Sequence, residues 1–157
     1  MTSRVAAIMK KRHATQFDIH SVRDLARQST VKYGVLSSGS TTHVFRASTL
    51  PYYEHMWSQM ANNPDTSFVQ TTSEGIERIL ASDDQNSWAF LSGSVALTSA
   101  ARNVSDLVLV TDPYNETYMS LAVPIGHPDL STLSMAILML SESDEINRLR
   151  IKWWNLE

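Results

Sequence analysis

Two neighbouring hydroxyl side chains, Ser40 and Thr41, follow Gly39 at a point where a helix is expected to begin. The first amide N–H groups of a helix have no acceptor inside the helix, and the positive end of the helix dipole lies beside them. A glycine just before them lets a ligand approach the backbone closely. These donors suit a carboxylate or a phosphate, so we expect a small anion to bind here. An ordinary turn, in which a serine or threonine caps the helix without any ligand, fits the same residues.

Other kinds of chemistry have less support. The five histidines form no pair at helical spacing and no recognisable ligand set, so we expect no metal site. Ser40 lacks the two flanking glycines of a hydrolase nucleophile turn. A dyad of Ser40 with His43 or His55 stays an alternative, and with it a small hydrolase. No glycine-rich loop ends in Gly-Lys-Ser/Thr, so we expect no nucleotide cofactor, no catalytic residue and no enzyme.

Two strands are expected to position the site. The run from Val31 to Leu36 is β-branched and aromatic, which predicts a buried strand that ends just before the Gly39 turn. Residues 88–91 predict another strand, followed by a small polar turn at 92–94 and a helix from Ala96 to Ala101. Because the carboxyl ends of parallel strands lie at one edge of a sheet, we expect both turns at the same edge.

Alternating helices and strands continue along the chain. Further helices are expected from Ser21, Pro51, Thr71, Leu130 and Ser143, and further strands at Phe68–Val69, Leu107–Val110 and Leu121–Val123, the last two separated by a turn at Asp112–Asn115. Residues 1–18 are poorly periodic, and we assign no strand there. This alternation predicts an α/β fold with a mainly parallel sheet between layers of helices.

Composition limits the function classes. With 157 residues, 43% of them hydrophobic and 18% charged, the chain has the size and balance of one globular domain. A net charge of -3 gives no sign of a nucleic-acid partner. There is no cysteine, so neither disulfides nor thiolate ligands are possible. No segment is apolar for long enough to span a bilayer.

Six short motifs resemble, in order, the second ligand-binding segment of the ionotropic glutamate receptors. Each motif is weak alone, and their common register along nearly the whole chain carries the resemblance. They are Ile19 to Ala26; Tyr33-Gly34 with Ser38 to Thr41 and Phe45; Tyr53 with Met56-Trp57; Thr71-Thr72 with Glu74-Gly75; Ala122 with Pro124 and Gly126; and Lys152-Trp153-Trp154.

The resemblance implies a fold and a division of the chain. In the family, two lobes of a periplasmic-binding-protein-like domain close around an amino acid and open an ion channel. Residues 19–123 would form lobe 2, and residues 124–157 would be helices that pack on a lobe 1 missing from this chain. Thr2 to Ala7 is similar to the end of the third membrane segment, so residues 1–18 would be its remnant and a linker, and the chain a partial one. Other subunits of a tetramer in the plasma membrane would be partners, and this segment would be extracellular.

The resemblance also implies roles for site residues. Gly39, Ser40 and Thr41 would hold the distal carboxylate of an amino-acid-like ligand, and Thr72 would help to latch the lobes. Gly93 stands where the family has an acid that pairs with the ligand's ammonium group. Met119 stands where a tyrosine commonly lines the pocket.

Because the acid that pairs with the ligand's ammonium group is missing at Gly93, we expect a receptor that diverges from the family in its ligand. An ammonium group that leaves water without a carboxylate partner is destabilised by several kcal/mol or so. We therefore expect glutamate to bind poorly, and a carboxylate ligand without an ammonium group at this place to bind better. An amino-acid solute-binding protein of a transporter, or a degenerate receptor-like domain without a ligand, are the alternatives.

Overall fold

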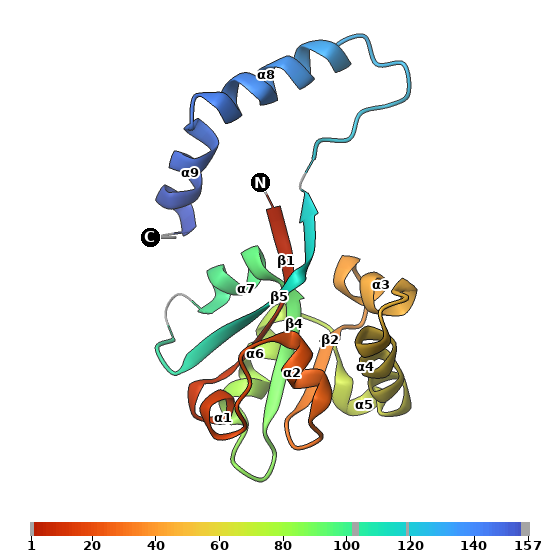
Figure 1. Ribbon diagram of the computed structural model, residues 1–157, viewed down its shortest axis with the longest axis vertical. Helices are drawn as coiled ribbons and strands as arrows, with labels where there is room; N and C mark the ends of the chain where they lie inside the picture. Colours follow the sequence, from red (N-terminus) through yellow and green to blue (C-terminus); the bar gives the residue numbers. More distant parts are fainter. Residues whose placement is uncertain (1, 102–103, 119, 155–157) are drawn as a thin grey trace. The chain divides into compact units, whose positions relative to one another are not determined.

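The computed structural model describes residues 2–101, 104–118 and 120–154, and the chain divides into two compact units (Figure 1). One unit comprises Ser3–Thr117, and the other comprises Tyr118–Glu157 with Met1–Thr2. The elements are β1 (Thr2–Lys10), α1 (Lys11–Gln16), α2 (Val22–Arg27), β2 (Lys32–Leu36), α3 (Ser40–Ala47), α4 (Pro51–Asn62), α5 (Pro64–Ser67), β3 (Phe68–Val69), α6 (Thr72–Ala81), β4 (Trp88–Gly93), α7 (Ser94–Ala101), β5 (Leu107–Tyr118), α8 (Leu130–Glu142) and α9 (Glu145–Trp154).

The larger unit is built on a five-stranded mixed sheet with the strand order β3-β2-β4-β1-β5. β2 runs parallel to both of its neighbours, β3 and β4. β1 runs antiparallel to β4, with Val5 opposite Gly93 and Ile8 opposite Phe90. The predicted α/β class is confirmed, and three of the predicted strands, β2, β3 and β4, form the parallel part of the sheet.

Strand β1 is the element that the sequence pattern fails to predict. Its residues Val5 to Met9 are all buried, with an exposed fraction of at most 5%. Val5, Ala7 and Met9 pack into one hydrophobic cluster, whereas Ala6 and Ile8 pack into the other. A strand covered on both faces has no alternation of apolar and polar residues. Residues 2–16 are thus a strand and a helix, whereas no strand is expected there.

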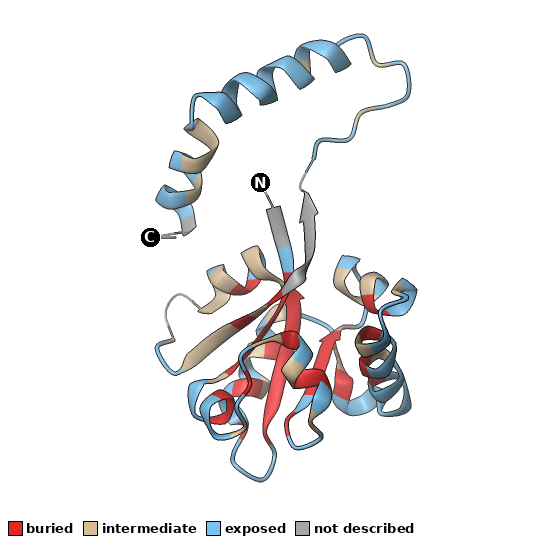
Figure 2. Cartoon of the chain, in the orientation of Figure 1, coloured by how far each residue is buried: buried red, intermediate tan, exposed pale blue. Residues whose placement is uncertain are grey.

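Helices cover both faces of the sheet, as predicted. One cluster joins β1, β2 and β4 to α2, α3 and α4 through residues such as Leu25, Phe45 and Met56. The other cluster joins the opposite face to α6 and α7 through Ile79 and Leu97. Figure 2 shows the buried residues, in red, along the central strands and on the sides of the helices that face them.

The end of the sheet differs from the prediction. β5 continues without a turn from Leu107 to Tyr118, so residues 112–115 are strand, and residues 121–123 are not. Asp112 explains part of the difference, because it is buried within the strand instead of exposed at a turn. Its carboxyl group accepts hydrogen bonds from the hydroxyls of Tyr52 and Tyr53 on α4. Two donors inside the protein make burial of this polar side chain tolerable.

The smaller unit holds α8 and α9, which contact each other. No α8 side chain is buried, and the apolar residues from Met135 to Leu140 include Met139 at 61% exposed. The expected boundary after residue 123 falls in the segment between β5 and α8. None of the helices among the described residues combines the length and the apolar character needed to cross a membrane.

Candidate functional site

The turn between β2 and α3 depends on Gly39. This residue immediately precedes α3, with φ 123° and ψ -178°. That backbone conformation strongly favours glycine, because a side chain is strained there. A Cβ at Gly39 would meet no atom within 4 Å, so the constraint comes from the backbone and not from crowding. The glycine therefore fixes the path by which the chain leaves β2 and enters α3.

The amides at the start of α3 are open. The N-cap residue is a glycine, so no side chain accepts a hydrogen bond from them. The first bond of the helix runs from the His43 N–H to the Gly39 carbonyl at 3.1 Å. Among the described residues, no acceptor is found for the N–H groups of Ser40, Thr41 and Thr42. The alternative of a serine or threonine that satisfies the turn by itself does not hold.

Three interactions brace this turn. The Thr42 hydroxyl donates to the carbonyl of Leu36 and ties the first helical turn back to the strand. The N–H of Ser37 donates to the Val69 carbonyl at 2.8 Å, and its hydroxyl contacts the Gln70 side chain at 3.1 Å. Ser40 is exposed and Thr41 is half-buried, and neither hydroxyl takes part in these contacts. Both hydroxyls stay available to a ligand.

Thr72 lies at the equivalent position after β3, as the first residue of α6. One amide of this helix start, that of Glu74, is capped by a side chain, in contrast to α3. The Thr71 hydroxyl accepts from the Glu74 N–H at 3.1 Å, and the Glu74 carboxylate accepts from the Gln70 N–H at 2.8 Å. This is the expected capping box. Thr72 is half-buried and takes no part in it, which leaves its side chain at the surface of the turn.

Gly93 ends β4 at the same edge of the sheet. β2 and β4 are parallel, with Gly34 opposite Phe90, so the same register carried on by three residues brings Gly93 level with Ser37. α7 begins directly at Ser94, without the expected intervening turn. The structure therefore brings Gly39, Ser40, Thr41, Thr72 and Gly93 to one edge, and Met119 lies outside the described residues. No carboxylate side chain is present at Gly93 to attract a cation.

Arg4 is the residue at this edge that the sequence pattern missed. Its N–H donates to the Ser94 hydroxyl at 3.1 Å, and the next residue, Val5, pairs with Gly93. Arg4 reaches this place only because β1 lies beside β4, and the pattern predicts no strand there. The Arg4 backbone thus lies beside the position where the resemblance leads one to expect an acid.

Comparison with known proteins identifies similar chains over most of this sequence. No family model matches. A curated relative from Caenorhabditis elegans, the ionotropic glutamate receptor kainate glr-3, is 35% identical over 153 residues, or 98% of this chain. The human ionotropic glutamate receptor kainate 1 is 31% identical over 136 residues, or 87% of this chain. The chain spans only 18% and 14% of the lengths of these two relatives.

A solved receptor structure is similar to this chain over nearly its whole length. The Drosophila muscle GluRIIB complex with glutamate is similar with a TM-score of 0.82 and 28% identity. The similarity covers 99% of this chain and 59% of that one. Nearly all of this chain thus corresponds to one part of a larger receptor structure.

Proposed function

Because this chain belongs to the ionotropic glutamate receptor family and matches its ligand-binding segment, we propose that it binds a small carboxylate ligand for a ligand-gated channel subunit. Residues 19–123 act as the second lobe, and residues 124–157 pack on a first lobe that another part of the subunit supplies. The subunit assembles with others as a tetramer in the plasma membrane, and this segment lies on the extracellular side of the membrane. The role is recognition, without an enzymatic step.

The open start of α3 carries this proposal. Three N–H groups, from Ser40, Thr41 and Thr42, lack an acceptor within the described chain, and the Gly39 backbone gives access to them. Hydrogen bonds to a charged acceptor contribute about 1.5–3 kcal/mol each, and the helix dipole adds about 0.3–1 kcal/mol for an anion. The hydroxyls of Ser40 and Thr41 extend this set of donors. A carboxylate gains most from it because its two oxygens accept several bonds.

The region around Gly93 sets the preferred ligand. A ligand ammonium group there meets no carboxylate at residue 93. The lack of an opposite charge at this position disfavours a positive charge on the ligand. We therefore propose that the ligand has a carboxylate for the α3 turn and no ammonium group directed at Gly93. Glutarate, which is glutamate without its amino group, is the simplest probe of this preference.

Backbone NMR of the 157-residue chain tests the proposal. We expect glutarate to shift the amide signals of Gly39 to Thr42 and to bind more tightly than glutamate. Ser40→Ala with Thr41→Val should weaken glutarate binding about fivefold or more, which corresponds to roughly 1 kcal/mol. Ser131→Ala, a matched change of an exposed serine on α8, should leave binding unchanged. Tight binding of glutamate by the unaltered chain would refute the stated preference.

A further inference from the structure

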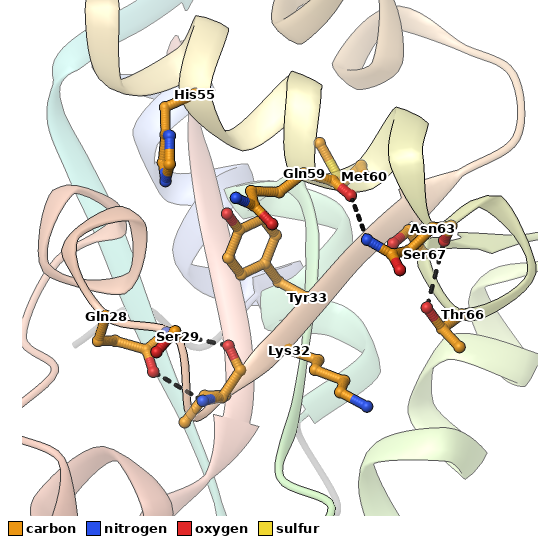
Figure 3. Close-up of a pocket in the computed structure, with 11 residues that line it drawn as sticks. Gln28, Ser29, Lys32, Tyr33, His55, Gln59, Met60, Asn63, Thr66 and Ser67 are labelled. Carbon is orange, nitrogen blue, oxygen red and sulfur yellow. Dashed lines mark hydrogen bonds between the residues drawn. The ribbon is translucent and has the colours of Figure 1, made fainter.

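A second cavity lies at the other end of β2, away from the Gly39 turn. Its volume is about 250 Å³, which is near the lower end for small-molecule sites. Lys32 and Tyr33 at the start of β2 form one wall, and Gln59 of α4 and Asn63, which directly follows α4, form another (Figure 3). Every lining residue belongs to the sheet-containing unit, so the cavity is a feature of that unit alone.

The Tyr33 side chain is the unusual group in this cavity. It is only 8% exposed, and in the described part of the chain its hydroxyl has no hydrogen-bond partner. In Figure 3 its ring extends from β2 toward His55 and Gln59 of α4. Burial raises the pKa of Tyr33 to about 12, so the hydroxyl keeps its proton at neutral pH and can donate. The hydroxyl oxygen is not itself enclosed by the protein, so it is open to the cavity, where a ligand acceptor can reach it.

The charges around the cavity favour an anion. Lys32 is cationic, whereas no aspartate or glutamate is found among the described residues that line the cavity. The amide side chain of Gln59 and the hydroxyl of Tyr33 offer neutral donors in addition. Val31 and Met60 contribute apolar surface. This combination suits a small organic anion with a short hydrocarbon part.

The walls are held by bonds inside the protein. The Gln28 side chain donates to the carbonyls of Leu25 and Val31 at 2.9 Å and accepts from the Val31 N–H at 2.6 Å. The Asn63 side chain donates to the Gln59 carbonyl at 3.0 Å. These bonds fix the loop before β2 and the end of α4. The cavity is therefore formed before any ligand arrives, which favours binding because little has to be ordered.

We propose that this cavity is a second binding site, for a small monocarboxylate whose oxygen accepts a hydrogen bond from Tyr33. It is independent of the proposed site at the Gly39 turn, because the two lie at opposite ends of β2. A molecule bound here contacts β2 and α4 and leaves the open amides of α3 free.

Three probes of similar size separate charge from shape: butyrate, butyramide and butylamine. Backbone NMR titrations of the 157-residue chain would follow the amide signals of Lys32, Tyr33 and Gln59, and separately those of Gly39 to Thr42. We expect butyrate to shift the amide signals of Lys32, Tyr33 and Gln59. Butyramide should bind at least about tenfold more weakly than butyrate, and butylamine should have no effect at these amides. Equal binding of butyrate and butyramide would overturn the assignment of an anion site.

Two variants locate the site. Tyr33→Phe removes only a hydroxyl without a partner, so it should leave the fold intact and weaken the butyrate response at Lys32 and Gln59 at least about fivefold. Ser40→Ala should leave that response unchanged and affect only the signals of the α3 turn. If butyrate shifts the α3 turn alone, or if Tyr33→Phe binds as the unaltered chain does, the second site is refuted while the first can still stand.

Discussion

The hydroxyl of Tyr53 donates to the buried carboxyl group of Asp112 at 2.6 Å. This bond joins the first turn of α4 to β5, across 59 positions of the sequence. Tyr52 donates to the same carboxyl oxygen at 2.8 Å from a less buried position. Asp112 is completely buried, so its acceptor atoms depend on these tyrosines and on other contacts inside the protein.

Tyr53→Phe should therefore lower the free energy of unfolding by about 1–3 kcal/mol, because a buried carboxyl group loses a donor. Urea unfolding followed by tryptophan fluorescence measures the change. Tyr33→Phe is the matched control, since it removes a tyrosine hydroxyl that opens onto a cavity and has no partner among the described residues, and it should change stability by less than about 0.5 kcal/mol. Equal losses in the two variants would contradict this account of Asp112.

Gly39→Ala tests the turn before α3. Its φ of 123° disfavours any side chain, so we expect the free energy of unfolding to fall by about 1–2 kcal/mol although there is room for a Cβ. Ser38→Ala, at the exposed neighbouring position, should have little effect. If the two variants are equally stable by urea unfolding, the turn does not require a glycine.

Gly93→Glu tests the selectivity for the ligand. The new carboxylate would stand at the end of β4 and favour a nearby ammonium group, so the ratio of glutamate affinity to glutarate affinity should rise about tenfold or more. Isothermal titration with both ligands measures the ratio. Gly93→Gln has a similar size without the charge and should leave the ratio nearly unchanged. A similar rise with glutamine would show that shape, and not charge, determines selectivity.

His13 predicts a dependence of stability on pH. Burial, and next the positive charge of Arg12, lower the pKa of His13 below its ordinary value of 6.5, while Asp84 opposes the shift. Between the lowered pKa and about 6.5 the unfolded chain therefore binds more protons, so the free energy of unfolding falls as the pH falls through this window. Urea unfolding between about pH 7.5 and about pH 5.5 should show this decrease. His13→Asn should show a smaller one, and an unchanged slope would exclude His13 as its source.

The apolar residues of α8 predict self-association. Met135, Leu138 and Met139 are each more than half exposed, and contiguous apolar surface of this kind is uncommon on monomers. We expect light scattering to detect aggregates of the 157-residue chain at about 50 μM, a concentration at which proteins with exposed apolar surface associate. Met135→Lys with Met139→Lys should reduce them. A monodisperse chain that melts cooperatively would contradict the prediction.

Patterns of local sequence predicted most of the elements. Ser21 and Thr71 cap α2 and α6 as expected, because a capping box is defined by residues only three apart. The parallel strands β2 and β4 were predicted from their β-branched and aromatic runs. The site was predicted because Gly39, Ser40 and Thr41 are contiguous, and their common edge with Gly93 follows from the rule for parallel strands.

The remaining features depend on distant partners. β1 has no alternating pattern because it is covered on both faces, and its place between β4 and β5 is decided by pairing across the whole unit. Arg4 was missed for that reason. The predicted strand stops at Val110, short of the observed β5, because Asp112 looks like a turn residue until its bonds to Tyr52 and Tyr53 are known. The cavity at Tyr33 likewise could not be predicted, because its walls come from both the loop before β2 and the end of α4.

The central position of β1 has a consequence for how the chain is made. Val5 can pair in the sheet and become buried only after Gly93, its partner 88 residues later, has been synthesised. Contacts between such distant residues are slow to form, because a long loop has to close first. A ribosome releases the apolar start of this chain long before its partner strand exists. In that interval the nascent segment from Val5 to Met9 is a natural target for a chaperone.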